Sequence, residues 1–101
     1  MTATTRPVNT DHAEVLRILS GWGSTAQVIR AIAEINRARH KGMAVEVLDG
    51  PEVHVYGPGG EAVVSPGARR DTWEIRFPVL GGKVSAGLGH SIRQAAWTVE
   101  E

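Results

Sequence analysis

The apolar residues between positions 24 and 42 recur at the spacing of an α-helix. The stripe consists of Val28, Ile29, Ile32 and Ile35. Ser24 precedes it and Gln27 follows Ser24 by three residues, which is the pattern of a capping box. Gly42 stands after a basic last turn, where helices often end in the left-handed conformation. We therefore predict a helix that begins after Ser24, ends at Gly42 and buries this stripe.

Two shorter segments, one at each end of the chain, also have helical spacing. Asp11 and Glu14 form a second capping pattern, and Val15, Leu16, Ile18 and Leu19 follow it. Two glycines in residues 20–23 end this helix. The last helix is predicted from about Ser91, with an apolar stripe of Ile92, Ala95, Ala96 and Val99.

Residues 43–88 alternate between apolar and polar positions, as strands with one buried face do. We predict strands at 43–48, 53–56, 62–65, 72–77 and 83–88, separated by short turns rich in Gly and Pro. Short connections favour an antiparallel meander. The predicted fold is α+β, with a sheet of about five strands packed against helices in the order ααβββββα.

We expect one domain at 11–101 after a flexible N-terminal tail at 1–10. Its core is predicted to contain Ile29, Ile32, Ile75, Phe77, Val84, Ile92 and Ala96. The first and last strands carry few charges, so we expect self-association through a strand edge or a helical face.

The composition limits the classes of function. The chain has 101 residues, of which 42% are hydrophobic and 22% charged, and these are ordinary values for a globular protein. It contains no cysteine, which excludes disulfides and thiolate metal sites and favours a cytoplasmic location. No apolar run approaches the length of a membrane span, and residues 1–10 lack the apolar region of a signal peptide.

The charge is unevenly spread, although the net charge is zero. Residues 1–42 carry six Lys or Arg against three acids, and residues 43–101 carry five against eight. Such a polarised chain can stack head to tail or dock an acidic partner by its helical end.

The sequence contains no pattern typical of a catalytic or metal site. The four histidines are far apart and no pair has the spacing that places two imidazoles on one metal ion. No nucleophile elbow and no paired carboxylates are present. We therefore predict a protein that is not an enzyme and that needs neither a cofactor nor a metal.

One stretch has the composition of an anion-binding loop. It contains Gly87, Gly89, His90 and Ser91 at the junction between the last strand and the last helix. Glycines allow the backbone to approach an anion, and a helix N-terminus offers free N–H groups. Ile92 stands where the dinucleotide fingerprint has its third glycine, so the simpler alternative is a bent connection.

Four residues are candidates for partner binding. Trp22, in the break between the first two helices, is either a plug over the core or an exposed anchor. Arg30, Arg37 and Lys41 share the exposed side of the long helix, and Glu34 can pair with either arginine. An acidic protein surface is the partner that we expect there, and a nucleic acid bound at the basic end of this helix is the alternative.

The C-terminal part resembles the strand–turn–strand–helix run of HicB-type antitoxins. The resemblance rests on Phe77, Pro78, Val79, Leu80, Gly81, Gly82, Val84, Ser85, Gly87, Gln94 and Ala95. Val79 and Gly81 depart from it, because the family has Asp and Pro there. The resemblance implies an antitoxin that binds a small ribonuclease toxin.

These observations together predict a small, non-enzymatic, regulatory module that binds a protein partner and forms a homo-oligomer. A nucleic-acid-binding regulator and a HicB-like antitoxin are the alternatives.

Overall fold

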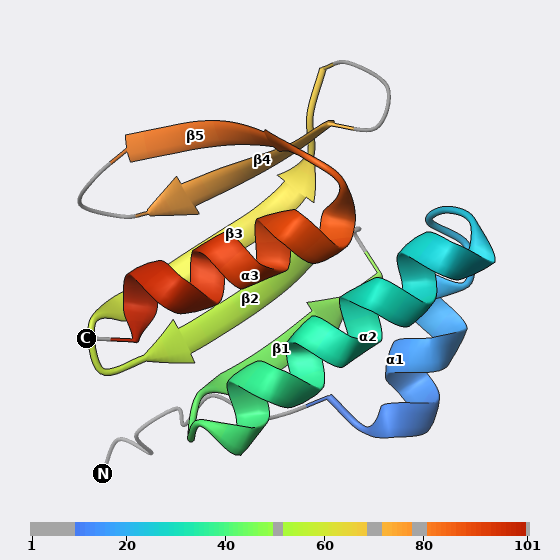
Figure 1. Cartoon of the computed structure of the whole chain (residues 1–101), viewed down its shortest axis with the longest axis horizontal. Helices are drawn as coiled ribbons and strands as arrows, with labels where there is room; N and C mark the ends of the chain where they lie inside the picture. Colours follow the sequence, from blue (N-terminus) through green and yellow to red (C-terminus); the bar gives the residue numbers. More distant parts are fainter. Residues whose placement is uncertain (1–9, 50–51, 69–71, 78–80, 101) are drawn as a thin grey trace, which may run out of the picture.

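A computed structural model describes residues 10–49, 52–68, 72–77 and 81–100, with the backbone alone at 81 and 83–86. Three helices and one antiparallel sheet make up this part of the chain (Figure 1). In chain order they are α1 (His12–Leu19), α2 (Thr25–His40), β1 (Ala44–Leu48), β2 (Glu52–Gly57), β3 (Gly60–Pro66), β4 (Thr72–Phe77), β5 (Gly81–Ala86) and α3 (Leu88–Val99). The α+β class and the antiparallel sheet packed against helices are confirmed.

Local signals set both ends of α2. The Ser24 hydroxyl accepts a hydrogen bond from the Gln27 backbone N–H, and the Gln27 side chain accepts one from the Ser24 N–H, both at 3.3 Å. At the other end Gly42 has a φ of +96°, in the left-handed region that glycine tolerates best. The predicted capping box and the predicted stop at Gly42 are both confirmed.

The strands follow one another across the sheet in the order β1-β2-β3-β4-β5, and each pair is antiparallel. The inward face is formed by alternate residues, which are Val45, Val47, Val53, Val55, Ala62, Val64, Trp73 and Ile75, all buried. The three helices lie over this face (Figure 1). The other face, which we call the open sheet face, has no helix over it among the described elements.

The predicted core is right in the sheet and partly wrong in α2. Ile75, Ile92 and Ala96 are buried as predicted, whereas Ile29 is 63% exposed and its prediction is wrong. Ile32 and Phe77 are partly buried, and the side chain of Val84 lies outside the described residues. The buried residues of α2 are Val28, Ala31, Glu34, Ile35 and Ala38. This stripe is rotated from the predicted one because α2 packs against both β1 and α3.

The junction before α3 also differs from the prediction. Gly87 has a φ of +83° and occupies the N-cap position, so α3 starts at Leu88 rather than near Ser91. Leu88 is 2% exposed and belongs to the helix, not to the last strand as the alternation suggested.

The edge of the sheet at β1 is occupied by residues that the sequence pattern did not assign to it. The Thr10 N–H donates to Val45 O at 3.1 Å, and its hydroxyl accepts from the Val47 N–H at 2.6 Å. Arg39 of α2 donates to Thr10 O at 2.7 Å and to Val45 O at 2.8 Å. Thr10 therefore belongs to the sheet edge rather than to the tail, and these contacts protect the edge from pairing with another chain.

Candidate functional site

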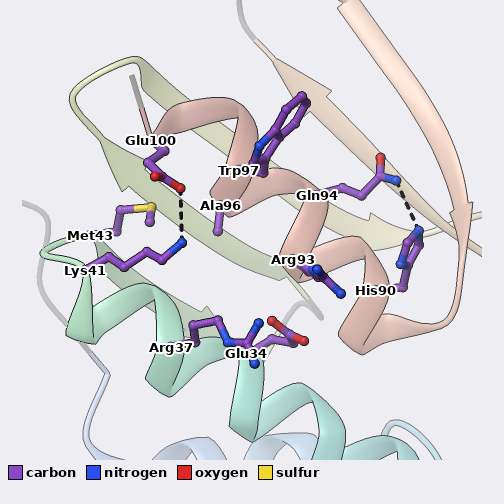
Figure 2. A pocket seen from close by; sticks show the side chains of 10 residues that line it. All are labelled: Glu34, Arg37, Lys41, Met43, His90, Arg93, Gln94, Ala96, Trp97 and Glu100. Atoms are coloured by element: carbon purple, nitrogen blue, oxygen red, sulfur yellow. Dashed lines mark hydrogen bonds and ion pairs between the residues drawn. The ribbon is translucent and has the colours of Figure 1, made fainter.

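A groove of about 340 Å³ runs between α2 and α3 (Figure 2). On one side it is lined by Glu34, Arg37 and Lys41, and on the other by His90, Arg93, Gln94 and Trp97. Residues three, four and seven positions apart share one face of a helix, so each helix presents its set in a row. We call this feature the α2–α3 groove.

Two guanidinium groups enter the groove from opposite helices. Arg37 and Arg93 are both exposed and point into the space between α2 and α3 (Figure 2). Within the described part of the chain, no carboxylate forms an ion pair with either of them. Lys41 Nζ lies 3.3 Å from Glu100 Oε1, and both side chains are more than two-fifths exposed. Since an exposed pair of this kind contributes little, Lys41 remains available to a partner.

Glu34 is a largely buried residue whose carboxylate lines the same groove. The residue is 9% exposed, and its carboxylate points toward the space between the helices (Figure 2). The predicted pairing with Arg30 or Arg37 is wrong, since neither forms an ion pair with Glu34 among the described residues. Among the described residues, no buried side-chain oxygen lacks a hydrogen-bond partner, so the Glu34 carboxylate, which pairs with none of them, reaches the solvent of the groove. A cation brought into the groove by a ligand would be attracted to this carboxylate.

Trp97 supplies an exposed aromatic surface at the groove. It is 75% exposed, the largest exposure among the bulky apolar residues that the structure describes. One turn earlier, the Gln94 amide lies 3.1 Å from His90 Nε2 and donates to it when that nitrogen is unprotonated. The α3 side of the groove thus combines an aromatic ring, polar groups and the Arg93 cation.

The structure brings only some of the predicted partner-binding residues together. Arg37 and Lys41 line the groove, whereas Arg30 is exposed outside it. Trp22 is half-buried at the opposite end of α2, with its ring centroid 5.7 Å from that of Trp73. This packing is the one expected of a plug over the core edge.

The predicted anion-binding stretch forms the first turn of α3. Gly87 is the N-cap, and a Cβ on Gly89 would lie 2.6 Å from Arg30 Cγ, so α2 packs closely there. The Ser91 side chain is fully buried and donates to Gly87 O at 2.9 Å, whereas His90 is exposed and lines the groove. The Ser91 hydroxyl therefore has a structural partner, and anion binding at this turn stays a prediction.

The sequence-based search missed Arg93, Trp97 and the groove position of Glu34. The signal for the first two was the polar face of the last helix, where positions 90, 93, 94 and 97 have helical spacing. The apolar stripe of that helix predicts its buried face and leaves these polar positions unassigned. Glu34 gave no such signal, because its burial depends on how α3 crosses α2.

A second polar cluster lies on the open sheet face around His54. Its Nε2 is 3.0 Å from Glu52 Oε1, and its Nδ1 is 3.3 Å from Glu61 Oε2. Burial lowers the pKa of His54, but the hydrogen bonds and charges of these two glutamates outweigh it, so the pKa is raised. The Tyr56 hydroxyl donates to Glu46 at 3.3 Å, and burial together with neighbouring carboxylates raises the pKa of Tyr56.

No group of three or more His, Cys, Asp or Glu residues suited to a metal ion occurs in the described part of the chain. None of the described helices has the length and apolar character that crossing a membrane requires.

No protein-family model matches the chain, and neither a curated protein nor a solved structure matches it. The resemblance to HicB-type antitoxins therefore rests on the quoted residues alone, of which Pro78, Val79 and Leu80 lie outside the described residues.

Proposed function

We propose that this protein is a non-enzymatic regulatory module whose α2–α3 groove docks an acidic segment of a protein partner. The observation that carries the proposal is the pair of exposed guanidinium groups, Arg37 and Arg93, that enter one groove from opposite helices without a carboxylate partner among the described residues. The lack of cysteine in the sequence supports action in a reducing compartment such as the cytoplasm.

The side chains of the groove match those that bind protein segments. A guanidinium holds a carboxylate through two parallel hydrogen bonds, which are about twice as strong as hydrogen bonds between neutral groups. Exposed tryptophan and arginine are the residues most often found at the energetic centre of protein interfaces. Arg37, Arg93 and Trp97 place both types within one groove.

A nucleic acid is the less favoured occupant of the groove. Glu34 and Glu100 line it beside the cations, and both would repel a phosphate backbone. An acidic protein segment can place its carboxylates on the arginines and turn other side chains toward these glutamates.

Fluorescence anisotropy at low salt tests the proposal with three labelled probes. They are an Asp/Glu-rich peptide, its Asn/Gln counterpart and a single-stranded oligonucleotide of the same length. We expect the wild-type protein to prefer the acidic peptide, and the Arg37→Glu/Arg93→Glu variant to bind it at least about tenfold more weakly. Arg30→Glu is the matched control, because Arg30 is an exposed arginine of α2 outside the groove.

Two outcomes contradict the proposal. One is unchanged binding of the acidic peptide by the folded double variant. The other is an equal loss in Arg30→Glu, which would show that net charge rather than the groove attracts the peptide. Tighter binding of the oligonucleotide than of the peptide would favour the nucleic-acid alternative instead.

A further inference from the structure

The open sheet face carries a hollow that is less basic than the α2–α3 groove. The hollow has a volume of about 550 Å³, and its lining includes Glu52, Glu74, Arg76, Val63 and Phe77. Its two carboxylates each have a neighbour there: Arg76 Nε lies 3.0 Å from Glu74 Oε1 in an exposed pair, and His54, which also lines the hollow, lies 3.0 Å from Glu52 Oε1. In the groove, the cations Arg37, Lys41 and Arg93 outnumber the carboxylates of Glu34 and Glu100.

The two surfaces lie on opposite sides of the molecule, since the helices cover the inward face of the sheet (Figure 1). Among the side chains that the structure describes, the open sheet face carries more carboxylates than cations, because Glu46, Glu52, Glu61 and Glu74 outnumber Arg76 and His54. The sequence already showed a basic N-terminal part and an acidic C-terminal part. The fold converts this difference into a basic groove on one side and an acidic hollow on the other.

We propose that the groove of one copy binds the hollow on the open sheet face of a second copy, so that the chains associate head to tail. The inference rests on the proposed function, because it names the acidic partner of the groove.

The side chains of the groove and the hollow complement one another. Trp97 is exposed at the groove, and the hollow offers Val63 as an apolar contact for its ring. Arg37 and Arg93 meet the carboxylates of the hollow.

Glu34 adds a second point of charge complementarity. The residue is 9% exposed, and its carboxylate opens into the groove with no cation within ion-pair distance among the described residues. The hollow of a second copy presents Arg76, whose side chain is 69% exposed and whose present partner is a surface carboxylate. Docking places this cation opposite the Glu34 carboxylate, where the two charges attract one another.

This arrangement predicts the form of the assembly. The two contact surfaces are different patches, so the contact is heterologous and extends into a ring or an open chain rather than closing as a twofold dimer. Exposed charges dominate it, so association is expected to weaken as salt screens them.

Complementary charge reversal tests the proposal by sedimentation velocity at low salt and high micromolar concentration. The first variant is Arg37→Glu/Arg93→Glu, and the second is Glu52→Lys/Glu74→Lys. Each is expected to be monomeric alone, because its two surfaces then have the same sign. An equimolar mixture is expected to associate again, since each reversed surface meets an opposite one. Arg30→Glu is the matched control and should associate as the wild type does.

A second substitution keeps the test independent of the folding of the double variants. Trp97→Ala changes an exposed side chain, and we expect it to weaken association by about tenfold or more, as the loss of an aromatic interface centre does. Circular dichroism and thermal unfolding check that every variant is folded.

Three results would overturn the inference: a monomeric wild type at low salt, folded reversed variants that do not associate when mixed, or unchanged association of Trp97→Ala.

Binding of the acidic peptide distinguishes a failure of this inference from a failure of the proposed function. If the Glu52→Lys/Glu74→Lys variant and the wild type bind the peptide equally but do not associate with copies of themselves, the groove docks another protein. If Arg37→Glu/Arg93→Glu binds the peptide as the wild type does, the proposed function is itself wrong.

Discussion

Two isoleucines at equivalent helical positions provide a matched test of the core. Ile29 is the fifth residue of α2 and Ile92 is the fifth residue of α3. Their apolar stripes predict that both are buried, but Ile92 is fully buried and Ile29 is 63% exposed. Replacing each with alanine removes the same atoms at the same helical position, so the difference between the two variants measures burial.

Ile92→Ala is expected to lower the free energy of unfolding by about 2–5 kcal/mol. This is the usual range when a fully buried isoleucine is truncated, because the lost transfer free energy adds to the cost of the cavity. A loss of about 3 kcal/mol lowers the Tm of a domain of this size by about 12–24 °C. Since small domains are stable by only about 5–15 kcal/mol, Ile92→Ala remains measurable but is strongly weakened.

Ile29→Ala is expected to change the free energy of unfolding by no more than about 0.5 kcal/mol. Its side chain is mostly in water in the folded protein, so truncation costs little burial. Alanine also has a higher helix propensity than isoleucine, which favours the variant by roughly a few tenths of a kcal/mol. We therefore expect Ile29→Ala to be slightly more stable than the wild type or equally stable.

Urea unfolding followed by tryptophan fluorescence measures both variants. Trp73 is 8% exposed and packs against Trp22, so unfolding changes the surroundings of both rings. Equal losses for the two variants would refute the placement of α2. A larger loss for Ile29→Ala than for Ile92→Ala would show that the face derived from the sequence is the buried one.

Three further changes test the cap of α2, the His54 cluster and the β1 edge. Ser24→Ala removes half of the capping box and is expected to cost about 1 kcal/mol in urea unfolding. His54→Gln tests pH dependence. Although burial lowers the pKa of His54, Glu52 and Glu61 raise it above the ordinary value of about 6.5. The protonated ring therefore stabilises the fold below that pH, and this contribution is lost as pH rises through the raised pKa. When Tm is measured from about pH 5 to about pH 9, the wild type should lose this stabilisation as His54 deprotonates, and His54→Gln should not. Thr10→Ala removes two hydrogen bonds to Val47 of β1. The Val47 amide, which donates to the Thr10 hydroxyl, should then exchange with solvent faster.

Each of these three predictions has a contradicting result. Unchanged stability of Ser24→Ala would mean that solvent replaces the cap without cost. A pH profile of His54→Gln that runs parallel to the wild-type profile would mean that other groups cause the dependence. Unchanged exchange of the β1 amide in Thr10→Ala would show that the hydroxyl does not protect the edge.

The sequence by itself determined the features that depend on neighbouring residues. The capping box of Ser24, the left-handed Gly42 and the alternation in residues 72–77 each involve groups a few positions apart in the chain. Such interactions act within one turn or one strand, so their residue patterns can be recognised without knowing what packs against them.

Only the tertiary structure decided which face of each helix is buried and where the groove lies. Glu34 is buried and Ile29 is exposed because α2 packs against β1 and α3 at the same time, and neither contact is encoded within α2 itself. Thr10 bonds to β1 across more than thirty positions of sequence. At such a separation, the pattern of residues does not predict which position pairs with which. The groove depends on the same long-range packing, because α2 supplies Arg37, α3 supplies Arg93, and the five-stranded sheet lies between the two helices in the chain.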